Sequence, residues 1–279
     1  MIKWQTNKVS IAVIMSLYRE DKLEYVKLAV ESLLNQTYQA FNLYIKFDGV
    51  IEIETEAYLR SLEDCRIMIS ARSENKGLAH SLNELLQEVK VLGYDFIARM
   101  DADDISLPDR FQRQIDFLNM NPQIDAVGGA INEIDELGND RGKITRYPCK
   151  PDECKKFFAR RNPVAHPTVM FRKSFFEKVG WEYPTDFARN EDTRLWHEGY
   201  KHGCSIANIS DVLLDFRMTD KMFTQRRNGR EFAKSQLELR KLIAKDLGYG
   251  NKAIFYAYAM YILMISPSWL LKFAYKVLR

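Results

Sequence analysis

Residues 95–104 read DFIARMDADD, and in this stretch a mostly apolar run leads directly into a cluster of acids. The first six residues are typical of a strand that is buried on both faces of a sheet. Asp101, Asp103 and Asp104 follow within four positions. In an open parallel sheet, ligands bind just outside the carboxyl ends of the strands. The stretch therefore predicts an α/β protein with a ligand site that begins at residue 101.

The sequence on the amino side of this stretch alternates between strand and helix patterns. Short apolar or alternating runs predict strands at 9–15, 41–47 and 66–70. Leucines and valines at helical spacing predict helices over 23–36 and 78–89. This alternation implies a mostly parallel central sheet with flanking helices. The second half of the chain is less regular, and we expect it to form the other wall of a cleft.

The composition is that of an ordinary globular protein. Of the 279 residues, 46% are hydrophobic and 28% are charged, which argues against wholesale disorder, collagen or a coiled coil. The four cysteines form no CxxC motif and no Cys/His cluster, so we predict neither a zinc site nor a disulfide framework. The first apolar run is too short for a secretory signal. These features fit a cytosolic protein.

The C-terminal part of the chain is strongly basic. Residues 216–279 contain 13 lysines and arginines against 4 acids, a net charge of +9, whereas residues 1–215 carry −6. A basic segment can meet nucleic acid or anionic lipid and lipid-phosphate headgroups, and charge alone does not distinguish them. We predict two parts, a main domain over 1–215 and a helical extension over 216–279.

Apolar residues in the extension favour lipid over nucleic acid. Residues 253–271 contain no charged side chain, and Lys272, Lys276 and Arg279 follow. About twenty apolar residues would span a bilayer, but Pro267 interrupts this run and tyrosines are frequent. Aromatic residues with flanking cations favour a helical hairpin in the membrane interface. A core or oligomer-interface helix and a true span are the alternatives. The interfacial interpretation predicts a peripheral protein at the cytoplasmic face of the inner membrane, with no nucleic acid partner.

The aspartates after residue 100 have a chemical interpretation of their own. Three acids within four residues repel one another, and a bound cation would compensate their charge. Carboxylate oxygens are hard ligands that suit Mg²⁺ or Mn²⁺. The alternative is an acidic loop that caps a helix beginning near Pro108, with Asp104 or Ser106 at the N-cap.

Six segments taken together resemble the GT-A glycosyltransferases of family 2. The resemblance covers residues 9–217 in order and implies a nucleotide-sugar-dependent enzyme in which DADD is the family's metal-binding DxD motif. The segments are VSIAVIMSLYRE (9–20), AVESLLNQTY with FNLYIKFDG (29–38 and 41–49), SENKGLAHSLNELL (73–86), IARMDADDISLPDRFQRQIDFLNMNP (97–122), HPTVMFRKSFFEKVGWE (166–182) and NEDTRLWHEGYKHG (190–203).

The resemblance assigns residues to the donor and its metal. It implies that Asp103 coordinates a Mn²⁺ or Mg²⁺ ion bridging the donor diphosphate, and that Asp101 shares this site and contacts the donor sugar or ribose. Arg226 and Arg227 are candidates to close over the diphosphate, with a solvated basic face as the alternative. The remaining nucleotide-binding candidates are Ser16, Tyr18, Asp48, Asn75 and Gly77.

The resemblance also implies that Asp192 is the catalytic base and that Glu191 beside it orients groups or contacts the acceptor. An inverting transfer needs one base that takes the proton of the attacking hydroxyl, and a cation that stabilises the departing diphosphate. The alternative is that both acids only stabilise a helix N-terminus. His166 and Trp181 are candidates for the acceptor pocket, although a lone histidine is more often a structural hydrogen-bonding group.

Two departures from the family pattern affect these assignments. Phe47 stands where the family has the first aspartate of its DDG turn, so recognition of the uracil ring depends on Asp48. Met218 and Thr219 occupy positions near which many relatives carry a histidine. A third protein ligand for the metal is therefore not evident from the sequence.

The predicted function is an inverting, metal-dependent transfer of a hexose or N-acetylhexosamine from a UDP-sugar. The predicted acceptor is a saccharide linked to a lipid diphosphate, because a basic tail suits such phosphates at a bilayer. The setting would be assembly of O-antigen, capsule or exopolysaccharide. One alternative is a sugar nucleotidyltransferase, which would normally carry a Gly-rich loop where this chain has SLYRE. The other is a non-catalytic, membrane-associated binding protein.

Overall fold

The computed structural model describes residues 10–219 and 230–266, and a nine-stranded sheet forms its centre. Eight strands follow the order β3-β2-β1-β4-β8-β6-β9-β5, and β7 pairs with β6 beside this path. The strands are β1 (Ile11–Leu17), β2 (Phe41–Asp48), β3 (Ile67–Arg72), β4 (Phe96–Arg99), β5 (Ile105–Ser106), β6 (Ala126–Ile134), β7 (Asp140–Thr145), β8 (Met170–Arg172) and β9 (Ile206–Arg217).

The first four strands in the order are parallel, as predicted. Ile11 of β1 is aligned with Phe41 of β2 and with Phe96 of β4, and β3 runs parallel to β2. The carboxyl ends of β1, β2 and β4 therefore meet at one edge of the sheet. This edge is where polar residues after the strands can be brought together.

The other strands make the sheet mixed and fold the chain back onto this edge. β8 runs antiparallel to both β4 and β6, whereas β6 and β9 are parallel. The short β5 pairs antiparallel with the end of β9, with Ile105 opposite Asp215. Because of this pairing, the acidic loop at 101–104 lies beside the end of β9.

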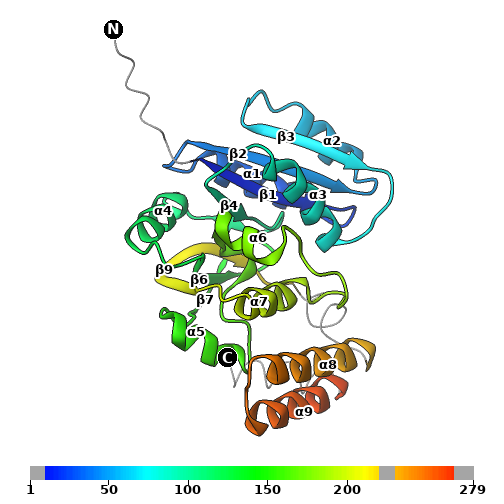
Figure 1. Ribbon diagram of the computed structural model, residues 1–279. Helices are drawn as coiled ribbons and strands as arrows, with labels where there is room; N and C mark the ends of the chain where they lie inside the picture. Colours follow the sequence, from blue (N-terminus) through cyan, green and yellow to red (C-terminus); the bar gives the residue numbers. More distant parts are fainter. Residues whose placement is uncertain (1–9, 220–229, 267–279) are drawn as a thin grey trace.

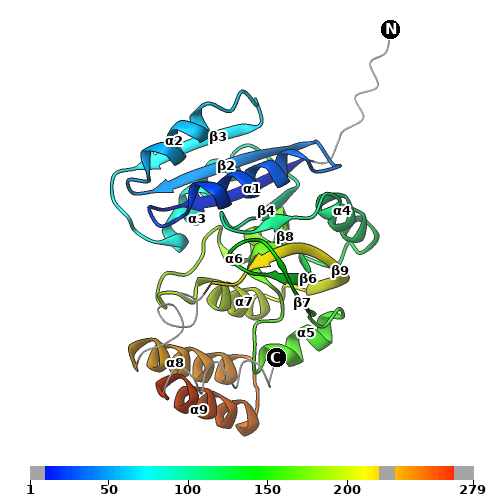
Figure 2. The same ribbon diagram turned by 180° about the vertical axis from the view of Figure 1, so that it is seen from behind.

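Helices cover both faces of the sheet (Figures 1 and 2). On one face, Val26 and Val30 pack with Val13, and on the other Leu82 and Leu86 pack with Ile14. This division follows from the alternation of side chains along β1. The helices are α1 (Leu23–Leu34), α2 (Ile53–Arg60), α3 (Leu78–Lys90), α4 (Arg110–Met120), α5 (Pro151–Phe158), the 3₁₀ helix η1 (His166–Thr168), α6 (Lys173–Val179), α7 (Glu191–Lys201), α8 (Arg230–Asp246) and α9 (Asn251–Ile265).

The C-terminal extension is a pair of helices packed under α7 (Figure 1). The predicted boundary at 215/216 falls inside β9, and α8 buries Leu239 and Ile243 in the same core as α3 and α7. α9 contacts α8 and lies farther from the sheet. Within 10–219 and 230–266, no helix has the length and apolar character needed to cross a membrane, and α9 has 15 residues.

Candidate active site

The predicted donor residues lie at the edge formed by the parallel strands. Ser16 is the second-to-last residue of β1, Tyr18 follows the strand directly, and Asp48 is the last residue of β2. Asp101 follows β4 after one intervening residue. The side-by-side pairing of β2, β1 and β4 therefore gathers residues that are up to 85 positions apart in the chain.

Asp48 holds the loop that leads into α3. Its Oδ1 accepts hydrogen bonds from the Arg72 guanidinium and from the backbone N–H of Lys76 at 2.7 Å, and its Oδ2 accepts one from the N–H of Gly77 at 2.9 Å. The side chain is only 4% exposed. Each carboxylate oxygen can accept two hydrogen bonds, so Oδ2 keeps one acceptor position after these contacts are counted.

Asn75 and Gly77 are also predicted to bind the nucleotide, and both belong to this loop before α3. Asn75 donates from Nδ2 to the backbone oxygen of Asp48 at 3.1 Å. Gly77 precedes α3 with φ of 92°, a conformation that favours glycine. Gly49 also has a positive φ, and a Cβ there would lie 2.9 Å from the backbone nitrogen of Asn75. Glycine at 49 thus allows the two loops to touch.

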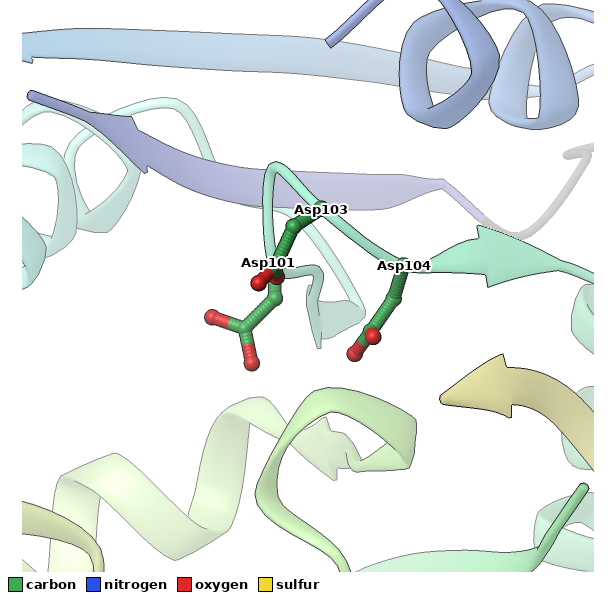
Figure 3. A group of neighbouring side chains, drawn as sticks. All are labelled: Asp101, Asp103 and Asp104. Carbon is green, nitrogen blue, oxygen red and sulfur yellow. The ribbon is translucent and has the colours of Figure 1, made fainter. Parts of the chain in front are cut away.

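The three aspartates after β4 form a compact group (Figure 3). Asp101, Asp103 and Asp104 each offer a carboxylate oxygen, and these oxygens lie within 4.8 Å of one another. Asp101 forms an ion pair with Arg99, which is buried. Asp104 is 1% exposed, and its Oδ2 has no hydrogen-bond partner. Burial, followed by repulsion from Asp103 and Asp101, raises the pKa of Asp104 well above its usual range.

Arg217 at the end of β9 fixes this loop from the other side. Its backbone N–H donates to Oδ1 of Asp104 at 2.9 Å, and its Nε donates to the backbone oxygen of Asp103 at 2.9 Å. Its guanidinium stacks 4.2 Å from the ring centroid of Tyr25 in α1. The alternative in which Asp104 caps the following helix is wrong, because α4 begins at Arg110 and Asp104 instead bonds to β9.

These residues suit a divalent cation. Three carboxylates converge, one of them has a buried oxygen without a partner, and all the donors are hard oxygen ligands. Asp104 belongs to the acidic cluster of the sequence but was assigned no role by the family motif, and it is thus a candidate third ligand. The buried Arg99 already balances part of the charge of the triad, because it pairs with Asp101 and its charge also reaches Asp104.

The acid pair opens helix α7. Asp192 accepts hydrogen bonds at Oδ2 from Asn162 Nδ2, at 2.8 Å, and at Oδ1 from the backbone N–H of Thr193, at 2.5 Å. Glu191 is the first residue of the helix. Burial, and then repulsion from Asp192 and more weakly from Asp101, raises the pKa of Glu191 to about 7, against an opposing effect of Arg99. Glu191 can therefore carry a proton near neutral pH.

Arg99 and Tyr183 connect the two acid groups. Arg99 pairs with Asp101, and its charge also reaches Glu191. Burial raises the pKa of Tyr183, Arg99 opposes this shift, and Glu191, Asp192 and Asp101 add to it. A single tyrosine thus responds to acids from both groups. The triad and the pair, ninety residues apart in sequence, thus act electrostatically on the same buried side chains.

The two predicted acceptor residues have different positions. Nε2 of His166 lies 3.1 Å from the hydroxyl of Tyr183, and burial, with the charge of Arg99, lowers the pKa of His166 well below its usual range. His166 is therefore a neutral ring close to the acid groups. Trp181 is 7% exposed and stacks on Phe176, so its ring packs in the core in this structure.

Some functional candidates lie outside these observations, and others were missed by the sequence analysis. Arg226 and Arg227 are outside the described residues. Arg99, Asn162 and Arg217 were not predicted, although a charged residue within a buried strand, as in FIARM and LLDFR, was a usable signal for the two arginines. No comparable sequence signal marked Asn162.

Comparison with known proteins agrees with this architecture. The fold is shared with mannosyltransferase PcManGT from Pyrobaculum calidifontis, solved in complex with GDP-Man and Mn²⁺, with a TM-score of 0.60 and 16% identity over 96% of this chain and 79% of that one. This likeness confirms the predicted GT-A fold.

Two relatives from Escherichia coli match along most of the chain. The O-antigen biosynthesis glycosyltransferase WbnJ is 34% identical over 76% of this chain and 80% of its own. The UDP-Gal:alpha-D-GlcNAc-diphosphoundecaprenol beta-1,3-galactosyltransferase is 28% identical over 81% and 80%. The family described as Glycosyl transferase family 2 matches residues 12–180. The chain therefore belongs to glycosyl transferase family 2, and it is a glycosyltransferase, as its six sequence segments predicted.

Proposed function

We propose that the protein transfers a sugar, with inversion, from a nucleotide-diphosphate sugar to a hydroxyl group of a saccharide acceptor. This proposal is supported by the relation of the two acid groups to Arg99 and Tyr183. The aspartate triad, which suits a cation, pairs with Arg99 through Asp101, and acids of both the triad and the Glu191/Asp192 pair act on the buried Tyr183. An inverting transfer needs both kinds of group, one for the leaving diphosphate and one for the attacking hydroxyl.

The donor would lie along the edge formed by β1, β2 and β4. Ser16 and Tyr18 would contact the nucleotide, and the open acceptor position on Asp48 Oδ2 would receive the N3–H of uracil. Asp101 and Asp103, with Asp104 as a third ligand, would hold Mn²⁺ or Mg²⁺. When bound, such a cation supplies charge that stabilises the departing diphosphate.

In the chemical step, the acceptor oxygen forms a bond to the anomeric carbon while the bond from that carbon to the diphosphate oxygen breaks. The proton of the acceptor hydroxyl passes to the carboxylate of Asp192. Hydrogen bonds from Asn162 and from the N–H and hydroxyl of Thr193 hold this carboxylate in place. Glu191 and the neutral ring of His166 would contact the acceptor.

The relatives support a narrower proposal about the substrates. One relative is named for UDP-Gal and an acceptor linked to diphosphoundecaprenol, and another for O-antigen biosynthesis. We infer a UDP-hexose or UDP-N-acetylhexosamine donor and a lipid-diphosphate-linked acceptor in surface polysaccharide assembly. A GDP-sugar donor is the competing option, because PcManGT was solved with GDP-Man.

Replacement of Asp192 by asparagine tests the assignment of the base. We expect Asp192→Asn to lower the transfer rate by about 10³-fold while UDP affinity in the presence of Mn²⁺ stays within twofold. Rates should be measured with a panel of UDP-, GDP- and dTDP-sugars, and Glu198→Gln on the same helix is the matched control. Loss of UDP affinity together with activity would contradict the role of Asp192 as base.

A membrane-facing surface on α9 fits the proposed acceptor. Phe255, Tyr258, Ile262 and Ile265 lie on one side of the helix, with Phe255 77% and Ile262 61% exposed. We infer that this apolar side of α9 rests on the cytoplasmic face of the inner membrane, where the enzyme would meet the proposed lipid-linked acceptor.

Paired polar substitutions test this surface. Phe255→Ser with Ile262→Ser should reduce sedimentation with anionic phosphatidylglycerol vesicles, without changing hydrolysis of the donor. Val91→Ser with Leu92→Ser, at exposed positions after α3, is the matched control. Unchanged sedimentation of the α9 variant would reject the surface.

A further inference from the structure

We propose that Asn162 and Arg240 are positioning residues for Asp192, which makes helix α8 of the C-terminal extension part of the catalytic unit. The proposal rests on the proposed role of Asp192 as base. Asn162 lies between α5 and η1, and Arg240 lies on α8, so neither is near the acid pair in sequence. Both reach it through a short chain of hydrogen bonds.

Asn162 is held with its amide in one orientation. Its Oδ1 accepts hydrogen bonds from the hydroxyl of Thr193 at 2.9 Å and from Nη2 of Arg240 at 3.2 Å. An arginine can only donate, so this end of the amide must be the oxygen. The amide nitrogen then faces Asp192, to which it donates at 2.8 Å. Arg240 therefore determines that Asp192 receives a donor rather than an acceptor.

Arg240 is fixed in turn by the residues at the end of α5. Its Nη1 donates to the backbone oxygen of Phe158 at 2.9 Å, and its guanidinium lies 5.4 Å from the centroid of the Phe158 ring. Burial lowers the pKa of Arg240 to about 10, and Asp192 is the group that most offsets this effect. Arg240 thus remains a cation at neutral pH and acts on Asp192 by charge as well as through Asn162.

A second contact joins α8 to the start of α7. Gln236, one turn before Arg240, donates to the side-chain oxygen of Asn190, which directly precedes the acid pair. The helix also packs Leu239 and Ile243 into the core that contains Trp196 of α7. The position of the acid pair is therefore set by a helix from the extension as well as by its own helix.

The network surrounds the two neighbouring acids differently. Asp192 faces the donors from Asn162 and Thr193 and the cation of Arg240, all of which attract its carboxylate. Glu191 and Tyr183 are titratable groups that interact with it among the described residues. A fixed donor and a fixed cation therefore hold the carboxylate of Asp192 in one place beside Glu191.

Two variants of the full-length enzyme test this inference. Asn162→Asp keeps the shape but replaces the donor by a carboxylate, and Arg240→Met removes the cation. We expect kcat to fall roughly 10 to 100-fold in each, with donor KM within twofold. The acid limb of the pH profile of kcat should move up by about one pH unit, because the ionised base has lost its support. Lys241→Met is the matched control, because it also removes a cation from α8, at the residue directly after Arg240.

The Asn162→Ala, Arg240→Met double variant completes the test. Arg240→Met should slow the Asn162→Ala variant by less than it slows the wild-type enzyme, since part of the effect of Arg240 passes through the amide and only its charge acts directly. An unchanged acid limb in Asn162→Asp, or an equal rise of donor KM and fall of kcat, would overturn the inference. If Arg240→Met does not fold, judged by thermal melting, the near-isosteric Asn162→Asp decides.

The outcome for Asp192 separates this inference from the proposed function. If Asp192→Asn stays active, the assignment of the base is wrong, and the positioning role falls with it. If Asp192→Asn is inactive while Asn162→Asp and Arg240→Met retain normal rates and pH profiles, only the positioning role is wrong.

Discussion

The aspartate triad and the Glu191/Asp192 pair are both acidic, yet the protein treats their charges in opposite ways. The triad is partly balanced by the buried Arg99, is held by hydrogen bonds from Arg217, and still leaves one buried oxygen of Asp104 without a partner. Neither acid of the pair has a buried unpartnered oxygen among the described side chains; Asp192 is hydrogen-bonded, and the pKa of Glu191 is raised to about 7. The first arrangement suits a metal cation, and the second suits a proton.

This difference follows from where each group lies in the fold. The triad follows a buried parallel strand, so its carboxylates project from a loop clamped between β4 and β9. The pair begins a helix, where backbone N–H groups without partners in the helix can bind a carboxylate. Position after a strand or at a helix start, rather than acidity itself, therefore separates the two roles.

The largest expected effect is the loss of the cation site. Asp104→Asn should reduce transfer by about 10³-fold, since a bound cation contributes several kcal/mol to the reaction. The melting temperature without metal should not fall, because the variant removes a buried, repelled charge and keeps the acceptor for Arg217. Calorimetric titration with UDP, in the presence and absence of Mn²⁺, measures how far UDP affinity depends on the cation. Asp109→Asn is the control, and wild-type Mn²⁺-dependent UDP affinity in Asp104→Asn would contradict the assignment.

A smaller effect is expected on stability when Glu191 is made neutral. Its pKa in the folded protein, about 7, lies above the ordinary 4.5, so the folded state keeps a proton that the unfolded state has lost as pH rises through this window. The cost is absent below about pH 4.5 and complete above pH 7, where it reaches about 3 kcal/mol. Glu191→Gln should therefore stabilise the protein by that amount at pH 8 and hardly at all at pH 4, as measured by urea unfolding.

Glu198 on the same helix provides the opposite case. Burial raises its pKa, but the hydrogen bond from Arg194 and the charge of that arginine lower it overall. Its contribution to stability is therefore present above its unfolded pKa and is lost as pH falls. Glu198→Gln should destabilise the protein at pH 8 and less at pH 4. If both variants changed stability in the same direction at pH 8, the contrast between the two glutamates would be wrong.

The smallest effect is expected from Thr193. Thr193→Val removes one of the two donors to Asn162 Oδ1, and with it a longer contact of 3.2 Å to Asp192 Oδ1, but leaves Arg240 and the backbone N–H of Thr193 in place. A single neutral hydrogen bond contributes about 1 kcal/mol, so kcat should fall less than tenfold and stability by about that amount. Ser61→Ala, which removes an exposed hydroxyl bond to Tyr58 in α2, is the control. A loss of kcat as large as that of Asn162→Asp would show that Arg240 does not hold the amide.

Much of the sheet and of its ligand edge could be predicted from the sequence, because apolar runs and helical spacing are local signals. The strands expected at 41–47 and 66–70 correspond to β2 and β3 within a few residues. The positions of Asp48 and Asp101 at one edge then follow from the rules for parallel sheets. The family assignment came from six ordered segments and is confirmed.

The rest of the site depends on contacts that no local pattern encodes. Asn162 meets Asp192 across 30 positions and Arg240 across 78. Trp181 was expected at the acceptor, but it follows Gly180 with a φ of 62°, and the chain there turns its ring into the core. The direction in which an aromatic side chain points cannot be read from the sequence around such a turn.

The stacking of α7, α8 and α9 determines how far the acid pair lies from the proposed membrane-facing helix. Helices packed side by side are about 8–10 Å apart, so two such steps put the start of α7 roughly 16–20 Å from the axis of α9. With α9 resting on lipid as proposed, the reacting hydroxyl must stand that far above the headgroups. A lipid-linked glycan too short to cover this distance would not be modified. The three helices would therefore select acceptors by a minimum length.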